Sequence, residues 1–260
     1  MTDDPWETHA SWWRSTFTGG ADPEYELQIL PLLAEHLAQY ETVLDLGTGE
    51  GQLARRLVSS GPPPRLVVGV DPSRAQLSNA IGAGAGPLYV LAAGESLPFR
   101  DGAFEAVACC LVIEHATDPD RVLSEAVRVL APGGRFVLLV NHPSFQGPGS
   151  GLVDDQILKE TYWRVGPYLK EQVALEDVGE GVRLRFAHRP LGRYVNPLVE
   201  LGLALTRLEE PSPPEAFLEE SIDIELEAAI PRLAMLRFDR VAIDGRSRGA
   251  GPPRGAGKVG

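Results

Sequence analysis

Short apolar runs alternate with helix-like segments from Glu41 to Val140. The apolar runs that predict buried strands are 42–46, 65–70, 88–92, 104–113 and 135–140. The segments between them that predict helices are 52–60, 73–81 and 120–130. The last helix has one apolar face, formed by Val122, Leu123, Ala126, Val127 and Leu130. This alternation predicts an α/β fold with a mostly parallel sheet and helices on both faces.

The alternation stops after Val140. Residues 141–181 are rich in glycine, proline, aromatic and acidic residues without a clean period, which is typical of a lid or a substrate-binding segment. The pattern then resumes, with strands predicted over 182–187, 203–208 and 233–243 and helices over 194–201 and 215–230. The whole pattern favours a Rossmann-like, seven-stranded sheet with an irregular lid after its fifth strand.

Composition narrows the classes of partner. The 260 residues carry a net charge of −12, and the tail at 246–260 is basic, so the rest of the chain is more acidic still. Such a chain would repel a phosphate backbone, so we expect no nucleic-acid partner. No apolar run is long enough to span a membrane, and the first twenty residues lack a secretory pattern, so we expect a cytoplasmic protein, either monomer or homodimer. The two cysteines, Cys109 and Cys110, are adjacent in an apolar run and have no metal-ligand spacing.

A glycine-rich turn follows the first predicted strand, in the sequence Val-Leu-Asp-Leu-Gly-Thr-Gly-Glu-Gly at 43–51. Glycines let the backbone turn sharply and let a ligand approach the main chain, and the amides at the start of the next helix point at that ligand. The turn alone is a weak signal because dinucleotide sites share it.

Two aspartates sharpen the interpretation. Asp71 lies 20 residues beyond Gly51 at the end of the second strand, where an acid can accept both hydroxyls of a ribose. Asp45 lies at the mouth of the first strand, where a carboxylate would repel a pyrophosphate but would suit a ligand with an ammonium and a sulfonium. S-adenosylmethionine (SAM) has both groups and no phosphate. The alternative is that Asp45 caps the turn and Asp71 caps a helix.

Four stretches in this order resemble the class I SAM-dependent methyltransferases, in the small-molecule branch of the ubiquinone- and menaquinone-biosynthesis enzymes. They are 43–51, 67–73 (VVGVDPS), 95–107 (ESLPFRDGAFEAV) and 122–140 (VLSEAVRVLAPGGRFVLLV). Residues 20–31 and 188–211 also resemble that family's N-terminal cap helix and its closing helix and strand. The resemblance implies N-terminal cap helices at 1–40 and a SAM-binding methyltransferase domain at 41–245. The glycine, proline and basic residues of 246–260 predict a disordered basic tail.

The resemblance also implies a role for individual residues in binding SAM. Gly47, Thr48, Gly49 and Gly51 would line its methionine part, with Asp45 near the amino group. Asp71 would bind the ribose, Pro72 would flank the adenine, and Glu95 and Ser96 would lie near the adenine edge. The floor beside the sulfonium would be Cys110 and Leu111, and Tyr25 would close over the site. One departure is Ala93, which stands where the family often has an acid for the adenine amine.

The acceptor side of the site is less specified. His142 follows the fifth strand, where open α/β sheets bind ligands, and is the first choice as general base. His115, beside Glu114, is the second choice, and it could instead orient the cofactor pocket or cap a helix; His188 is expected to be structural. In the lid, Tyr162, Trp163 and Tyr168 either face the methyl group or the acceptor, or form the lid's own core. Asp154, with Asp155, either contacts the acceptor or is simply solvated.

The residues after the fourth strand restrict the kind of atom that could accept the methyl group. Cys110–Ile113 replaces the Asn/Asp-Pro-Pro-Tyr/Phe run of enzymes that methylate DNA bases or glutamine, so an oxygen or carbon acceptor, or a small amine, is favoured. There is no three-cysteine cluster for radical chemistry. Two alternatives stay open. One is a non-catalytic SAM-binding protein. The other is an NAD-dependent oxidoreductase, which would want a third glycine that residues 47–52 lack in register.

Overall fold

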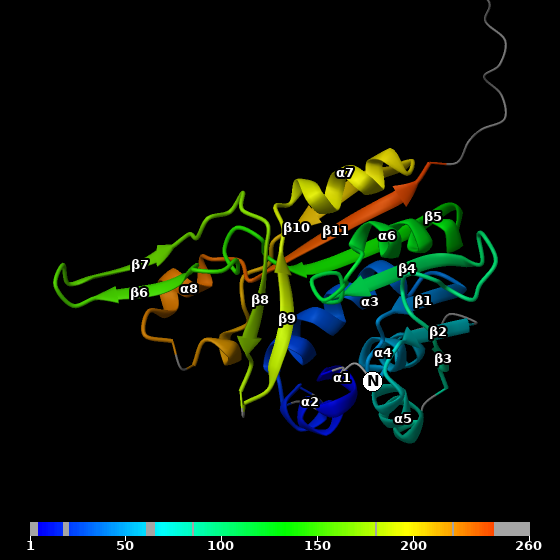
Figure 1. The fold of residues 1–260 in the computed structure, drawn as a ribbon, viewed down its shortest axis with the longest axis horizontal. Coiled ribbons are helices and arrows are strands. Elements are labelled where there is room, and N and C mark those ends of the chain that lie inside the picture. Colours follow the sequence, from blue (N-terminus) through cyan, green and yellow to red (C-terminus); the bar gives the residue numbers. More distant parts are fainter. Residues whose placement is uncertain are drawn as a thin grey trace, which may run out of the picture.

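A seven-stranded sheet forms the centre of the computed structural model, which describes residues 5–17, 21–60, 66–84, 86–179, 181–219 and 221–241 (Figure 1). The strand order is β10-β11-β5-β4-β1-β2-β3. The bounds are β1 Thr42–Leu46, β2 Leu66–Asp71, β3 Leu88–Leu91, β4 Phe104–Cys110, β5 Leu130–Asn141, β10 Leu203–Glu209 and β11 Leu233–Arg240. Only β11 runs antiparallel to its neighbours within this sheet. The predicted Rossmann-like, mostly parallel sheet is confirmed.

Helices cover both faces of the sheet. On one face, α3 (Leu30–Leu37) and α4 (Gln52–Ser59) pack on side chains such as Val43. On the other, α6 (Pro119–Val129) and α7 (Gly192–Glu200) pack on side chains such as Leu44. The helix α5 (Arg74–Ala83) lies against β2 and β3. Because successive residues of a central strand are buried on opposite faces, these strands appear in the sequence as continuous apolar runs.

The N-terminal segment is helical where the structure describes it. It forms α1 (Pro5–Thr8), α2 (Ala10–Phe17) and the π-helical turn η1 (Tyr25–Ile29), which leads directly into α3. The helix α1 lies beside α5, and α2 packs on α1, so neither belongs to the layers that cover the sheet (Figure 1). None of the helices in the described ranges is long and apolar enough to cross a membrane.

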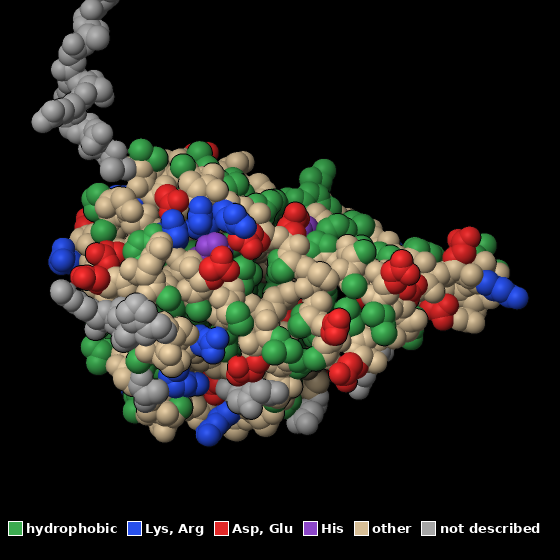
Figure 2. Space-filling view, turned by 180° about the vertical axis from the view of Figure 1, so that it is seen from behind, with side chains coloured by type: hydrophobic (Ala, Val, Ile, Leu, Met, Phe, Trp, Pro, Cys, Tyr) green, Lys and Arg blue, Asp and Glu red, His purple; other side chains and the backbone are tan. Residues whose placement is uncertain are grey.

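The segment expected to be an irregular lid is more ordered than its composition suggests. It contains the hairpin β6–β7 (Gly151–Asp155 and Glu160–Arg164) and the first strand of the hairpin β8–β9 (Gln172–Asp177 and Arg183–His188). The run at 182–187 is a strand, as predicted, but it pairs with β8 and lies outside the central sheet. The β6–β7 hairpin projects from the body of the molecule (Figures 1 and 2).

The prediction of a single acidic helix at 215–230 is wrong. The chain forms a 3-10 turn, η2 (Glu215–Phe217), and a separate short helix, α8 (Ile224–Ala228). Asp223 explains the break, because its carboxylate accepts a hydrogen bond from Leu226 N at 3.0 Å and so starts a new helix there. The predicted basic tail at 246–260 and the end of the last predicted strand lie outside the described residues.

Candidate functional site

The glycine turn at the carboxyl end of β1 has the backbone that the sequence requires. Gly47, Gly49 and Gly51 have φ values of 73°, 54° and 82°, in the left-handed region that disfavours other residues. A β-carbon at Gly47 would also lie 2.3 Å from a methyl carbon of Val112. The amides of Gly47 and Thr48 both donate to the Val70 carbonyl, so the turn is fixed to the neighbouring strand β2.

Asp45 is a buried carboxylate at the start of this turn. It is 2% exposed, and its Oδ2 accepts a hydrogen bond from the Thr48 hydroxyl at 2.6 Å. Burial raises the pKa of Asp45 to about 6, and the nearby charge of Asp71 raises it further. Among the described residues, no lysine or arginine forms an ion pair with Asp45 to offset this cost. A cationic ligand at this position would therefore stabilise the ionised form.

Asp71 connects the turn to the next helix. Its Oδ2 accepts a hydrogen bond from Gly49 N, and its Oδ1 accepts one from Ser73 N, both at 2.9 Å. Ser73 is the N-cap of α5, with its Oγ accepting from Gln76 N. The end of β2 thus holds a second buried carboxylate in a fixed orientation beside the glycine turn.

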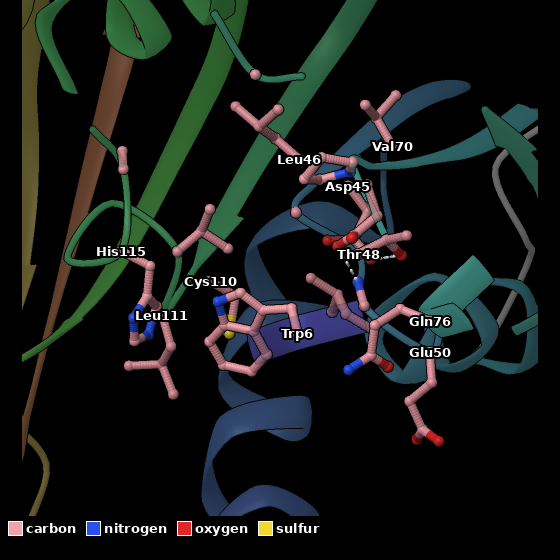
Figure 3. A pocket seen from close by; sticks show the side chains of 18 of the residues that line it. Trp6, Asp45, Leu46, Thr48, Glu50, Val70, Gln76, Cys110, Leu111 and His115 are labelled. Atoms are coloured by element: carbon pink, nitrogen blue, oxygen red, sulfur yellow. Dashed lines mark hydrogen bonds between the residues drawn. The ribbon is translucent and has the colours of Figure 1, made fainter. Parts of the chain in front are cut away.

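One cavity of about 530 Å³ collects most of the predicted cofactor residues (Figure 3). Those that line it are Tyr25, Asp45, Gly47, Thr48, Gly49, Asp71, Pro72, Glu95, Cys110 and Leu111, together with the candidate base His115. Gly51 and Ser96 do not line it, although Gly51 shapes the turn. The cavity therefore brings together residues from the ends of β1, β2 and β4.

The floor of this cavity is uncharged and its backbone is strained. Leu111 has a φ of 54°, which is rare for a residue with a branched side chain and is typical of functional sites. The Tyr25 hydroxyl lies close to the Cys110 thiol, and burial raises the pKa of both groups well above their usual values. Both groups are therefore neutral at physiological pH.

His115 closes one side of the cavity. Its Nδ1 lies 2.7 Å from the carbonyl oxygen of Arg185, on β9. Because a carbonyl can only accept, Nδ1 carries the proton and Nε2 is left as a hydrogen-bond acceptor. The ring lies between Trp6 and Phe186, with centroid distances of 4.9 and 4.5 Å. Burial lowers the pKa of His115 to about 4, so the imidazole is neutral.

The aromatic residues of the N-terminal helices were not among the predicted site residues. Trp6 lines the cavity (Figure 3). Trp13 lines it as well, with its ring 5.0 Å from that of Trp6. The Glu7 carboxylate accepts hydrogen bonds from Ser73 Oγ at 2.7 Å and Ala75 N at 3.1 Å, at the start of α5. The cluster of aromatic residues between Trp6 and Phe17 was the only signal of this role in the sequence.

The remaining candidates lie elsewhere. His142 lines a second cavity, of about 220 Å³, and its Nε2 lies 2.7 Å from Glu210 Oε1. His188 lines the same cavity and donates from Nε2 to the Tyr168 carbonyl, while the Tyr168 hydroxyl accepts from Leu191 N. The other lid candidates, Asp154, Tyr162 and Trp163, are on the projecting β6–β7 hairpin and line neither cavity.

Comparison with known proteins identifies related chains. Residues 44–138 match the family model described as a methyltransferase domain. An uncharacterized methyltransferase of Mycobacterium sp. (strain JLS) is 40% identical over 110 residues, which are 42% of each chain. The match thus spans well under half the length of that relative. The ubiquinone/menaquinone biosynthesis C-methyltransferase UbiE of Methylobacterium nodulans is 30% identical over 194 residues, which are 72% of each chain.

Solved structures share the architecture. An S-adenosylmethionine dependent methyltransferase from Mesorhizobium loti superposes with a TM-score of 0.69 and 25% identity, over 83% of this chain and 97% of that one. The family model covers β1 to β5, and so includes the glycine turn, Asp71 and the floor of the first cavity.

Proposed function

The chain belongs to the class I SAM-dependent methyltransferases, and from this premise we propose that it transfers the methyl group of SAM to an oxygen or carbon atom of a small-molecule acceptor. The observation that carries the proposal is the pair of buried carboxylates, Asp45 and Asp71, that line one cavity on either side of the glycine turn. The pair provides an anionic contact for an amino group and a hydrogen-bond acceptor for a sugar.

The residues of the first cavity fit SAM. Asp45 would hold the ammonium of the methionine part, which offsets the burial that raises the pKa of this carboxyl. Asp71 would accept the ribose hydroxyls, and Pro72 would flank the adenine. The neutral pair Tyr25 and Cys110 would lie near the sulfonium, where a charged thiolate or phenolate would be open to methylation.

When bound, SAM supplies an electrophilic methyl carbon on a positively charged sulfur. The protein's task is mainly to hold the acceptor close to that carbon and to exclude water. Positioning of this kind lowers a barrier by roughly 7–11 kcal/mol. The rings of Trp6 and His115 form the wall of the cavity that excludes water, and an indole face also favours a cationic ligand.

His115 is better placed than His142 to contact the reacting group. Its Nε2 accepts hydrogen bonds, and its side chain lines the first cavity, whereas His142 lines the second. With a pKa of about 4, His115 is a weak base. We therefore assign to it the role of accepting a hydrogen bond from the acceptor's hydroxyl and so orienting the nucleophile.

The acceptor is proposed on two grounds. The relatives named C-methyltransferases favour a carbon atom, and a neighbouring hydroxyl on that acceptor would meet His115. The net charge of −12 does not favour a nucleic-acid acceptor. On the face shown in Figure 2, basic side chains are interspersed with acidic ones, whereas nucleic-acid binding normally requires a continuous basic patch. A small uncharged or weakly polar acceptor suits both grounds.

The proposal is tested with SAM that carries a deuterated methyl group. The protein is incubated with this donor and a bacterial metabolite extract, and mass spectrometry follows S-adenosylhomocysteine and any deuterium-labelled product. We expect both to form with the native chain and neither with Asp45→Asn. Tight SAM binding without either product would favour a non-catalytic SAM-binding protein. Binding of a nicotinamide cofactor without SAM binding would favour an oxidoreductase.

A further inference from the structure

A second cavity lies beside the first, at the carboxyl ends of β4 and β5. Its volume is about 220 Å³, and its polar lining includes Glu114, Asn141, His142, Gln146 and Arg189. The proposed SAM site uses none of these side chains. Glu114, His142 and Arg189 are all buried, which is unusual for so many ionisable groups unless they are paired or meet a ligand.

Two buried atoms of this cavity lack partners. Glu114 is 5% exposed, and its Oε1 accepts hydrogen bonds from Asn141 N at 2.8 Å and Asn141 Nδ2 at 3.3 Å. Within the described residues, Glu114 Oε2 has no hydrogen-bond partner, and neither has the buried Nε2 of Gln146. Buried polar atoms in folded proteins are almost always paired. The cavity therefore offers one acceptor and one donor to a ligand.

The charges around the cavity favour a neutral ligand. Burial raises the pKa of Glu114 to about 7, and the charge of Arg189, which donates to the Ile113 carbonyl at 3.2 Å, opposes this rise. The other cation, Arg232, pairs with Glu24 at 3.0 Å, and His142 pairs with Glu210. An anion would meet Glu114 and Glu176, and a cation would meet the two arginines.

The two cavities share a wall. Glu114 and His115 are consecutive, but Glu114 lines the second cavity and His115 lines the first. Phe186 also lines the second cavity, and its ring lies 4.5 Å from that of His115. The contacting rings of His115 and Phe186 therefore lie between the two cavities, and an acceptor held in the second cavity would have to extend past Phe186 to meet the methyl group.

We propose that the second cavity binds a hydroxyl group at the far end of the methyl acceptor, with Glu114 Oε2 accepting its hydrogen and Gln146 Nε2 donating to its oxygen. One hydroxyl satisfies both unpaired atoms, and the apolar part of the acceptor lies against Phe186. This hydroxyl is distinct from the group at the reacting atom. The inference rests on the proposed function for its identification of the ligand as the acceptor.

The test compares phenol with toluene, which has the same shape but cannot form these hydrogen bonds. Each is titrated into the full chain bound to S-adenosylhomocysteine, and NMR follows the side-chain amides of Asn141 and Gln146. We expect phenol to shift these signals saturably, with toluene at least tenfold weaker. Glu114→Gln, which turns the acceptor into a donor, should weaken the phenol response at least tenfold. Glu35→Gln removes the same charge from an exposed position on α3 and should not change it.

Affinity for S-adenosylhomocysteine shows whether each variant is folded. If Glu114→Gln does not fold, Gln146→Leu removes the donor from a less buried position and should also weaken phenol binding. Equal responses to phenol and toluene, or a phenol response unchanged in these variants, would overturn the hydroxyl site. Phenol binding in a chain that yields no methylated product would support the site and overturn the methyltransferase function alone. Methyl transfer without a phenol response would support the methyltransferase function and overturn the hydroxyl site alone.

Discussion

Glu7 and Ser73, which are far apart in the sequence, are joined by a hydrogen bond of 2.7 Å from the serine hydroxyl to the carboxylate. The backbone amide of the same serine donates to Asp71. One residue thus connects the N-terminal helix that carries Trp6 with the carboxylate proposed to bind the ribose. The position of the helix and the geometry of the ribose site are therefore coupled.

Glu7→Gln should loosen this connection. The contact is at the surface and screened by solvent, so we expect S-adenosylhomocysteine to dissociate about two- to fivefold faster, with little change in protein stability. Stopped-flow tryptophan fluorescence measures the rate, because Trp6 lines the cavity. Glu26→Gln, at an exposed position of η1, is the matched control. An identical rate in both variants would show that Glu7 does not hold the helix over the site.

The same contact should respond to acid. The hydrogen bond from Ser73 lowers the pKa of Glu7 below its usual value of 4.5. The contact is therefore fully present above pH 4.5 and is lost as the pH falls through the lowered pKa. Dissociation of S-adenosylhomocysteine from the native chain should approach that from Glu7→Gln only in that acid range, and the ratio of the two rates should stay constant between pH 6 and 8.

Asp71→Ala should reduce SAM affinity by about tenfold or more. The substitution removes a hydrogen-bonded carboxylate, and a hydrogen bond to a charged group contributes about 1.5–3 kcal/mol. It also frees the amides of Gly49 and Ser73 that the carboxylate now holds. Titration calorimetry measures the affinity, with Glu35→Ala as the control for loss of charge. Unchanged affinity would remove Asp71 from the ribose site.

Asp45→Asn should raise the stability of the protein while it weakens the binding of SAM. The folded chain raises the pKa of Asp45 from 3.8 to about 6, so the ionised group destabilises the free protein above this range, by up to about 3 kcal/mol. As the pH falls below 3.8 the carboxyl becomes protonated in both folded and unfolded states, and the effect fades. We expect the variant to have a higher Tm than the native chain at pH 7.5, a nearly equal Tm at pH 3.5, and weaker SAM binding. A lower Tm at pH 7.5 would contradict this account.

These two aspartates were predictable from the sequence because the signal is local. Each lies at the end of an apolar run, and parallel strands bring their carboxyl ends to one edge of the sheet. The role of Trp6 was not predictable in this way, because it depends on the contact between Glu7 and Ser73, which no periodicity encodes. The same holds for β9, whose alternation identified a strand but not its partner, β8.

Gly47→Ala should strongly reduce stability and SAM binding, whereas Gly82→Ala should not. Gly47 combines a φ of 73° with a contact of 2.3 Å between a new β-carbon and Val112, so we expect a loss of about 1–3 kcal/mol of stability together with SAM binding. Gly82 lies in α5 with open space around its α-carbon, so alanine there should stabilise the chain by about 0.5–1 kcal/mol. Thermal unfolding distinguishes the two. Similar effects at both positions would mean that the turn is not constrained.

The hydrogen-bond partners of the two histidines could not be predicted from the sequence. His142 follows β5 directly, which made it the better candidate by position alone, and His115 lies further from its strand, β4. The side-chain directions decide which cavity each one lines, and they depend on Glu210 and on the Arg185 carbonyl, both distant in sequence. No spacing rule would have supplied these partners.

His115→Gln should lower kcat by about a hundredfold, at the low end for a histidine that acts in proton chemistry, because its pKa of about 4 makes it a hydrogen-bond acceptor more than a base. SAM affinity should change less than threefold, since Asp45 and Asp71 are intact. His142→Gln is the comparison: it lines the second cavity, so it should act mainly on KM for the acceptor. Because the two side chains line different cavities, the variant with the larger fall in kcat identifies the cavity that holds the reacting atom. A larger fall in kcat for His142→Gln would place methyl transfer in the second cavity.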